Sequence, residues 1–127
     1  MNTPNIHELC QGEVNDFMLG LVQKELNNIP PNTFCRRRDL CEAILACNRV
    51  EGNRARIKEE MQSILKTWSA RQSEINKLEA LGFNITKGKT HYKIRFNNSV
   101  YFSALPTSPS DHRGGSNSAT HAVNAFF

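Results

Sequence analysis

The alternation of residues from Lys87 to Phe96 constrains this chain more than any other feature of its sequence. Every second residue up to Arg95 is basic or a histidine, and an apolar series lies between them. The first set is Lys87, Lys89, His91, Lys93 and Arg95, and the second set is Tyr92, Ile94 and Phe96. Because successive side chains of a β-strand point to opposite faces, this pattern predicts a strand with one cationic and one apolar face.

The cationic face has no acidic neighbour in the sequence, since no Asp or Glu occurs between Ala80 and Ser110. Like charges on one strand face repel, and an anion bound against them would remove that cost. Phosphate is the anion that the pattern favours. The alternative is a solvated edge strand that its lysines keep from aggregating.

The net charge is unevenly distributed along the chain. Residues 1–70 hold nine Lys/Arg and nine Asp/Glu, whereas residues 71–127 hold seven and three, so the whole formal excess of +4 lies in the second part. This asymmetry predicts two functional halves, with the anion-facing half at the C-terminal end.

The chain has 39% hydrophobic residues, and no apolar run approaches the roughly 18 residues of a membrane span. Its N-terminal residues do not form a secretion signal. We therefore expect a cytoplasmic protein without membrane contact.

The four cysteines lack the two-residue spacing of zinc and redox motifs. His7 and Cys10 form one H-x-x-C pair, but no second pair completes a metal site. Cys41 and Cys47 lie in an apolar helical pattern, where small core residues of a reducing compartment are expected. We therefore expect neither a metal nor any other cofactor.

Residues 1–70 predict a helical segment of three helices. Apolar residues recur at three- and four-residue intervals in the first helix, at Val14, Phe17, Met18, Leu21, Val22 and Leu26. Pro30 and Pro31 should end that helix, because consecutive prolines cannot continue it. The second helix carries Leu40, Cys41, Ile44 and Leu45, and the third carries Ile57, Met61, Ile64, Leu65 and Trp68, with Gly52-Asn53 as the break between them.

Three consecutive arginines, Arg36, Arg37 and Arg38, lie near the start of the second predicted helix. Cations at this end oppose the helix dipole unless acids offset them or an external anion binds. Asp39 and Glu42 could supply the offset. The sequence leaves a solvated charge cluster and a phosphate contact both open.

Residues 71–127 predict a small αβββα domain with a three-stranded antiparallel sheet, so the expected fold class is α+β. Ser73 can cap a short helix that Gly82 ends. Strands are expected at 83–86, 90–96 and 100–105, joined by a turn at Lys87-Gly88-Lys89 and a hairpin at Asn97-Asn98. Val100, Phe102 and Ala104 share one face of the third strand, and we expect Val100 and Phe102 to be buried with the apolar face of the second. Ser116 can cap a last helix with Ala119, Ala122, Val123 and Phe126 along one side.

The loop before the last predicted helix is a second candidate site, at residues 108–117. Glycines such as Gly114 let backbone N–H groups approach an anion, and a helix N-terminus favours negative charge. Arg113 adds a bidentate phosphate donor. The alternative is a polar connector whose proline and glycine residues only set turns.

The segment Lys87-Gly88-Lys89-Thr90-His91-Tyr92 and the element order resemble the double-stranded-RNA-binding-like fold, and within it the HicA-type mRNA interferase toxins. The resemblance covers Ser73 to Phe127. It implies RNA as a partner and a histidine that cleaves RNA. Two residues separate Gly88 from His91, where the family pattern usually has one, so Thr90 can take the position of the family's histidine and leave His91 on the cationic face.

Three functions follow from these observations. The first is RNA binding through Lys87, Lys89, Thr90, Lys93 and Arg95, with Arg113, Gly114 and the three arginines as further contacts. The second is a metal-independent endoribonuclease of a toxin or defence system, with His91 as base, His112 as its partner and the RNA 2′-OH as nucleophile. The third is a protein-interaction module in which the N-terminal helices bind a protein partner.

Overall fold

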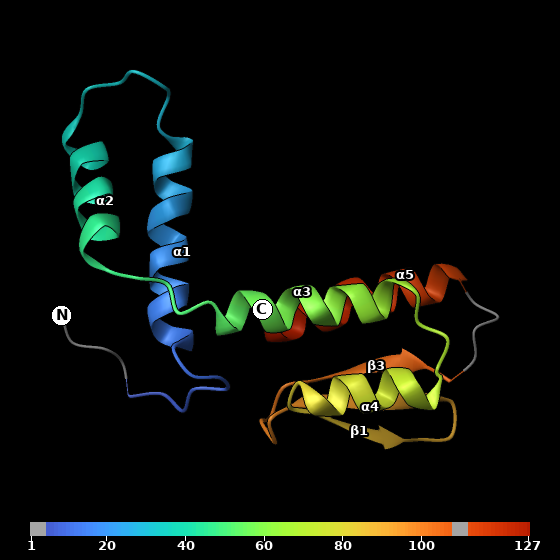
Figure 1. Cartoon of the computed structure of the whole chain (residues 1–127). Helices are drawn as coiled ribbons and strands as arrows, with labels where there is room; N and C mark the ends of the chain where they lie inside the picture. The colour runs from blue at the N-terminus through green and yellow to red at the C-terminus, as the bar shows by residue number, and fades with distance from the viewer. Residues whose placement is uncertain (1–4, 108–111) are drawn as a thin grey trace. The chain divides into compact units, whose positions relative to one another are not determined.

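The computed structural model describes residues 5–107 and 112–127, with no side chains described for 112–117 (Figure 1). The chain forms two compact units, Met1–Arg54 and Ala55–Phe127. We expected this division after residue 70. The structure divides the chain after Arg54 instead, so the third helix belongs to the second unit. The α+β fold class is confirmed, with helices followed by a three-stranded antiparallel sheet and a C-terminal helix.

The first unit contains two packed helices, α1 (Glu13–Asn28) and α2 (Arg36–Cys47) (Figure 1). As predicted, α1 ends just before the prolines, and Ile29 after it is buried. The apolar stripe predicted for α1 overlaps its buried face in part, since four of its six residues are partly buried: Val14, Met18, Val22 and Leu26. Leu19 is buried, whereas Phe17 and Leu21 are about half exposed. The periodicity predicted the helix correctly, but its buried face is shifted away from Phe17 and Leu21 toward Leu19.

Among the described residues of the first unit, the charged side chain of Asp16 in α1 is buried. Its carboxylate accepts hydrogen bonds at 2.8 Å from the backbone N–H groups of Glu51 and Gly52. The Asn15 amide donates a third bond at 3.1 Å. These bonds attach the segment before α3 to α1, which the sequence pattern did not predict.

The second unit contains α3 (Asn53–Lys66), α4 (Gln72–Ala80), β1 (Phe83–Lys87), β2 (His91–Phe96), β3 (Phe102–Pro106) and α5 (His112–Phe126). The strands pair in the order β1-β2-β3, and both pairings are antiparallel. Helix α3 begins at Asn53, directly after Gly52 with its φ of 92°, as the expected break predicted.

The core of the second unit lies between the helices and one face of the sheet. The ring centroids of Phe83 and Phe96 are 4.6 Å apart, and Phe126 of α5 packs 5.5 Å from Phe83. The other buried apolar residues come from the helices of this unit and from β2 and β3, and they are Ile57, Met61, Leu65, Ile75, Leu78, Ile94, Leu105, Ala122 and Val123. This core covers the apolar face of β2, whereas residues on the other face of the sheet, such as Thr86, Lys93 and Phe102, are exposed.

Two predicted helix starts are wrong in detail. Helix α4 begins at Gln72, and Glu74 does the capping expected of Ser73, because its carboxylate accepts a 2.9 Å bond from the Arg71 backbone N–H. Helix α5 begins at His112, so Ser116 lies inside the helix. The end of α4 is as predicted, with Gly82 at a φ of 107° that favours glycine.

Candidate nucleic-acid interface

The strand register determines which side chains share the open face of the sheet. Residues paired across an antiparallel ladder point to the same side. Lys93 pairs with Thr86 and Ala104, and Arg95 pairs with Asn84 and Phe102. We call the surface formed by these residues and His91 the outer face. Ile94 and Phe96 point the other way and are 0% and 1% exposed, so the alternation predicted for β2 is confirmed.

The predicted row of cations is shorter than the sequence suggested. Lys87 belongs to β1, pairs with Tyr92 and therefore has the orientation of the apolar set, although it is exposed at the strand end. Lys89 lies in the turn and is exposed. The row on the outer face is His91, Lys93 and Arg95, of which Arg95 is only partly exposed. A hairpin between β1 and β2 interrupts the two-residue period, which the linear pattern does not reveal.

Phe102 lies on the outer face, and the expectation that it is buried is wrong. The Phe102 residue is 58% exposed, and Val100 is 80% exposed. The buried residue of β3 is Leu105, which pairs with Tyr92 on the helix-covered side. Strand β3 has apolar residues on both of its faces, so its sequence alone could not show which face is directed at the core.

A cation and this aromatic ring are in contact on the outer face. The Lys93 ammonium lies 4.4 Å from the centroid of the Phe102 ring, within cation–π range. No ion pair of Lys93 or Arg95 is found within the described part of the chain. The outer face therefore presents positive charge and an exposed ring together.

The turn before β2 positions His91. The Gly88 N–H donates a 2.8 Å bond to the His91 carbonyl, and a Cβ at Gly88 would lie only 2.9 Å from that oxygen. A glycine is therefore needed for this close approach. The Thr90 hydroxyl is 2.9 Å from His91 Nδ1, and the Thr90 carbonyl accepts a 3.2 Å bond from the Thr107 hydroxyl. The imidazole is exposed and oriented by Thr90.

The second candidate site lies at the start of α5. His112, Arg113 and Gly114 form its first turn, where backbone N–H groups lack intrahelical acceptors. Their side chains lie outside the described residues, so the proposed pairing of His112 with His91 stays a prediction. The connector is shorter than expected, because the helix starts before Gly114 instead of after it.

The arginine cluster belongs to the first unit and has partners there. Arg38 donates bonds of 2.9 and 2.8 Å to the carbonyls of Thr33 and Pro30, and Arg37 forms a 3.1 Å ion pair with Glu25. Arg36 is exposed at the first position of α2. Arg37 and Arg38 thus stabilise the helix pair, a role that the sequence pattern did not distinguish from phosphate binding.

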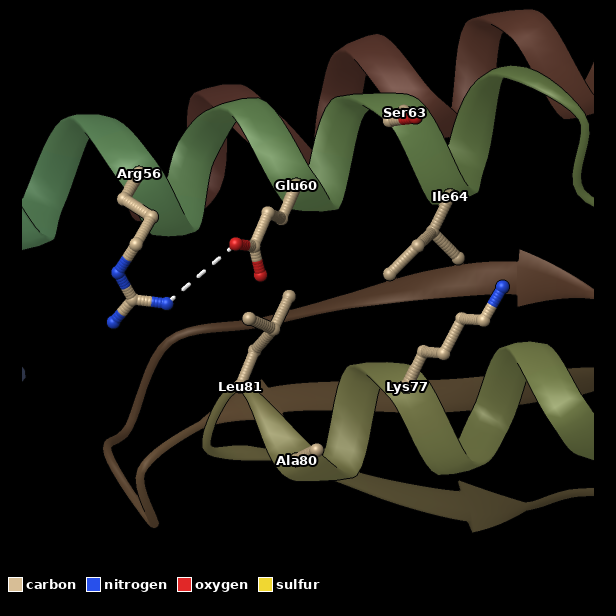
Figure 2. Close-up of a pocket in the computed structure, with 7 residues that line it drawn as sticks. All are labelled: Arg56, Glu60, Ser63, Ile64, Lys77, Ala80 and Leu81. Carbon is tan, nitrogen blue, oxygen red and sulfur yellow. Dashed lines mark ion pairs between the residues drawn. The ribbon is translucent and has the colours of Figure 1, made fainter.

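A groove of about 460 Å³ lies between α3 and α4 (Figure 2). An Arg56–Glu60 ion pair of 3.7 Å lies at one end, and Lys77, Ile64 and Leu81 line the remainder. None of the predicted site residues lines it. Because the groove holds an internal ion pair and none of the predicted phosphate contacts, we take the outer face as the candidate site.

The described residues include no group of three metal-ligating side chains. Cys41 is buried as expected, whereas Cys47 is exposed and was wrongly predicted to be a core residue. Within the same part of the chain, no helix has both the length and the apolar character needed to cross a bilayer. Comparisons with protein-family models, curated proteins and solved structures find no match to this chain.

Proposed function

We propose that the second unit binds RNA, with phosphate groups lying against the outer face. The observation that carries this proposal is the position of Lys93 and Arg95 on an exposed sheet face, without an acidic partner among the described residues. Lys87, Lys89 and Thr90 border the row at the hairpin, and the first turn of α5 is a further phosphate contact in this proposal. The resemblance to the HicA-type toxins supports RNA as the ligand.

Charge-neutralising variants test this proposal. In Lys89→Gln, Lys93→Gln and Arg95→Gln, each lost phosphate contact should make the negative slope of log K against log[salt] shallower by about 0.7 for single-stranded RNA. Glutamine retains most of the partly buried Arg95 side chain. Fluorescence anisotropy with labelled RNA at several salt concentrations measures the slope.

The matched control for these variants is Lys77→Gln, an exposed lysine on α4 away from the outer face. It should leave the slope unchanged. A triple variant that retains the wild-type slope would show that the row is only a solvated face.

A second candidate is a metal-independent endoribonuclease, favoured by the oriented His91 imidazole beside Lys93. His91 would accept the proton of a 2′-OH, whose oxygen would attack the adjacent phosphorus and displace the 5′-oxygen, which takes up a proton. The products are a 2′,3′-cyclic phosphate and a 5′-OH. This function is supported if the wild type cleaves RNA in EDTA and His91→Gln binds RNA without cleaving it. RNA that stays intact with the wild type would contradict this function.

We also propose a protein contact for the first unit and a cytoplasmic location. Exposed apolar side chains are common at protein interfaces, and the two helices carry four of them, Phe17 and Leu21 in α1 and Leu40 and Ile44 in α2. If the contact is between copies of the chain, Leu40→Ser with Ile44→Ser should lower the sedimentation coefficient.

The proposed cytoplasmic location is supported by the free cysteines, which are typical of a reducing compartment.

A further inference from the structure

We propose that the outer face selects single-stranded over double-stranded RNA by stacking an unpaired base on the ring of Phe102. This inference rests on the proposed RNA binding and adds the substrate class. It starts from an unusual combination: an exposed aromatic side chain on a sheet face that otherwise carries cations, small residues and polar residues. A phosphate-binding surface alone does not need the ring.

The position of Phe102 suits a stacking platform. The register places it directly opposite Arg95 and diagonally from Lys93, whose ammonium lies 4.4 Å from the ring centroid. The ring therefore has a cation on the neighbouring strand at two successive outer-face positions. A nucleotide whose base stacks on Phe102 would have its backbone within reach of both cations, which a lone surface aromatic would not provide.

The surroundings of the ring leave room for a base. Phe102 is 58% exposed, and its neighbour on the same face of β3 is Ala104, which is also exposed. Thr86 and Asn84 on β1 are similarly exposed and small. The side chain that lies over the ring is that of Lys93, which is long and flexible enough to move from the ring to a phosphate.

The chemistry of the ring distinguishes single strands from duplexes. Bases of a duplex are stacked on each other and do not offer a free π-face, whereas unpaired bases stack on aromatic side chains. The cations attract either form through its phosphates. Phe102 is thus the component of the outer face that should separate the two RNA forms, and stacking should tolerate any base sequence.

The test compares the full chain with Phe102→Leu and Phe102→Tyr, using a labelled 12-nucleotide RNA and a duplex of the same sequence. We expect the wild type to bind the single strand more tightly. Phe102→Leu should weaken single-strand binding roughly tenfold, as expected for a lost base–aromatic stack, with duplex affinity and salt slope unchanged. Phe102→Tyr keeps a ring and should retain the preference.

Tyr101→Leu is the matched control, because Tyr101 is a similarly exposed ring, at 51%, that precedes β3 and has no partner in the sheet register. It should leave both affinities unchanged. Thermal unfolding by circular dichroism shows whether each variant is folded before affinities are compared.

Three results would overturn the inference. Unchanged single-strand affinity in Phe102→Leu would leave cation-mediated RNA binding standing without stacking. An equal loss of affinity for the single strand and the duplex would mean that Phe102 supports the structure of the outer face and does not stack with a base. A lower sedimentation coefficient of Phe102→Leu without RNA, with unchanged RNA affinity, would assign the face to a second copy of the chain. If the wild type binds neither RNA, the proposed function itself fails.

Discussion

At the scale of single residues, Asp16 is the group on which the first unit depends most clearly. Burial raises the pKa of its carboxyl, but the N–H groups of Glu51 and Gly52, the Asn15 amide and the charge of Arg54 outweigh burial, so the pKa is lowered overall. The ionised form is therefore the one that the fold stabilises. Hydrogen bonds to a buried charged group contribute about 1.5–3 kcal/mol each.

We predict that Asp16→Asn lowers the free energy of unfolding by about 1–3 kcal/mol. An amide has one acceptor oxygen, and its NH₂ group would face the backbone N–H of Glu51 or Gly52. Chemical denaturation monitored by circular dichroism measures the change. Asp39→Asn, which alters an exposed acid of α2, should cost less than half as much.

The same residue predicts a pH dependence. A carboxyl whose folded pKa is below its unfolded pKa binds fewer protons in the folded state, so its stabilisation is complete above the ordinary Asp range near 4 and is lost as the pH falls through the folded pKa. Between pH 7 and pH 3, the wild type should therefore lose more stability than Asp16→Asn. Parallel pH profiles of the two proteins would contradict this account.

At the scale of elements, the connection between β2 and β3 begins with a tight turn at Asn97-Asn98. Both asparagines have positive φ, 47° and 56°, and the Ser99 N–H donates a 2.9 Å bond to the Phe96 carbonyl. The Asn98 N–H also donates to Asn84 Oδ1 at 2.9 Å. Consecutive left-handed residues match the twist of an antiparallel pair, as the sequence predicted.

We predict opposite effects for two asparagine-to-alanine changes. Asn98→Ala should destabilise the second unit by about 1 kcal/mol, because alanine resists the left-handed region, whereas Asn98→Gly should be close to neutral. Asn124→Ala, on the exposed side of α5, should stabilise by a few tenths of a kcal/mol, since alanine favours helix. Thermal unfolding midpoints measure all three. Equal effects at Asn98 and Asn124 would show that backbone conformation does not determine the turn.

At the scale of the whole molecule, the two units differ in charge and in surface. Residues 1–54 hold six Lys/Arg and seven Asp/Glu, a balance of −1, and residues 55–127 hold ten and five, a balance of +5. Most of the exposed large apolar side chains lie in the first unit, and the outer face lies in the second. The charge division expected from the sequence therefore becomes sharper when α3 is counted with the sheet.

We predict that a fragment of residues 53–127 folds and that a fragment of residues 71–127 does not fold stably. The shorter fragment lacks Ile57, Met61 and Leu65, each of which contributes about 1.5–3 kcal/mol when buried. It also lacks Trp68, whose indole N–H donates to the Pro106 carbonyl at 2.9 Å. The lost burial is comparable to the whole stability of a small domain. Cooperative unfolding of both fragments would show that α3 is dispensable.

The sequence by itself determined what depends on local periodicity and on backbone conformation. The alternation of β2 required one buried face, Pro30 and Pro31 ended α1, and Gly82, Asn97 and Asn98 occupy the positive-φ positions that their residue types favour. It also located most of the candidate site, since His91 and Lys93 lie on one exposed face as the two-residue period predicts.

Only the tertiary structure decided the features that depend on which surfaces meet. Both faces of β3 carry apolar residues. Pairing with β2 buried Leu105 and left Phe102 beside Lys93 and Arg95. The hairpin removed Lys87 from the cationic row, and the core of the second unit included α3. Burial is a property of contacts between segments far apart in the chain, so a pattern within one segment can define its two faces but cannot choose between them.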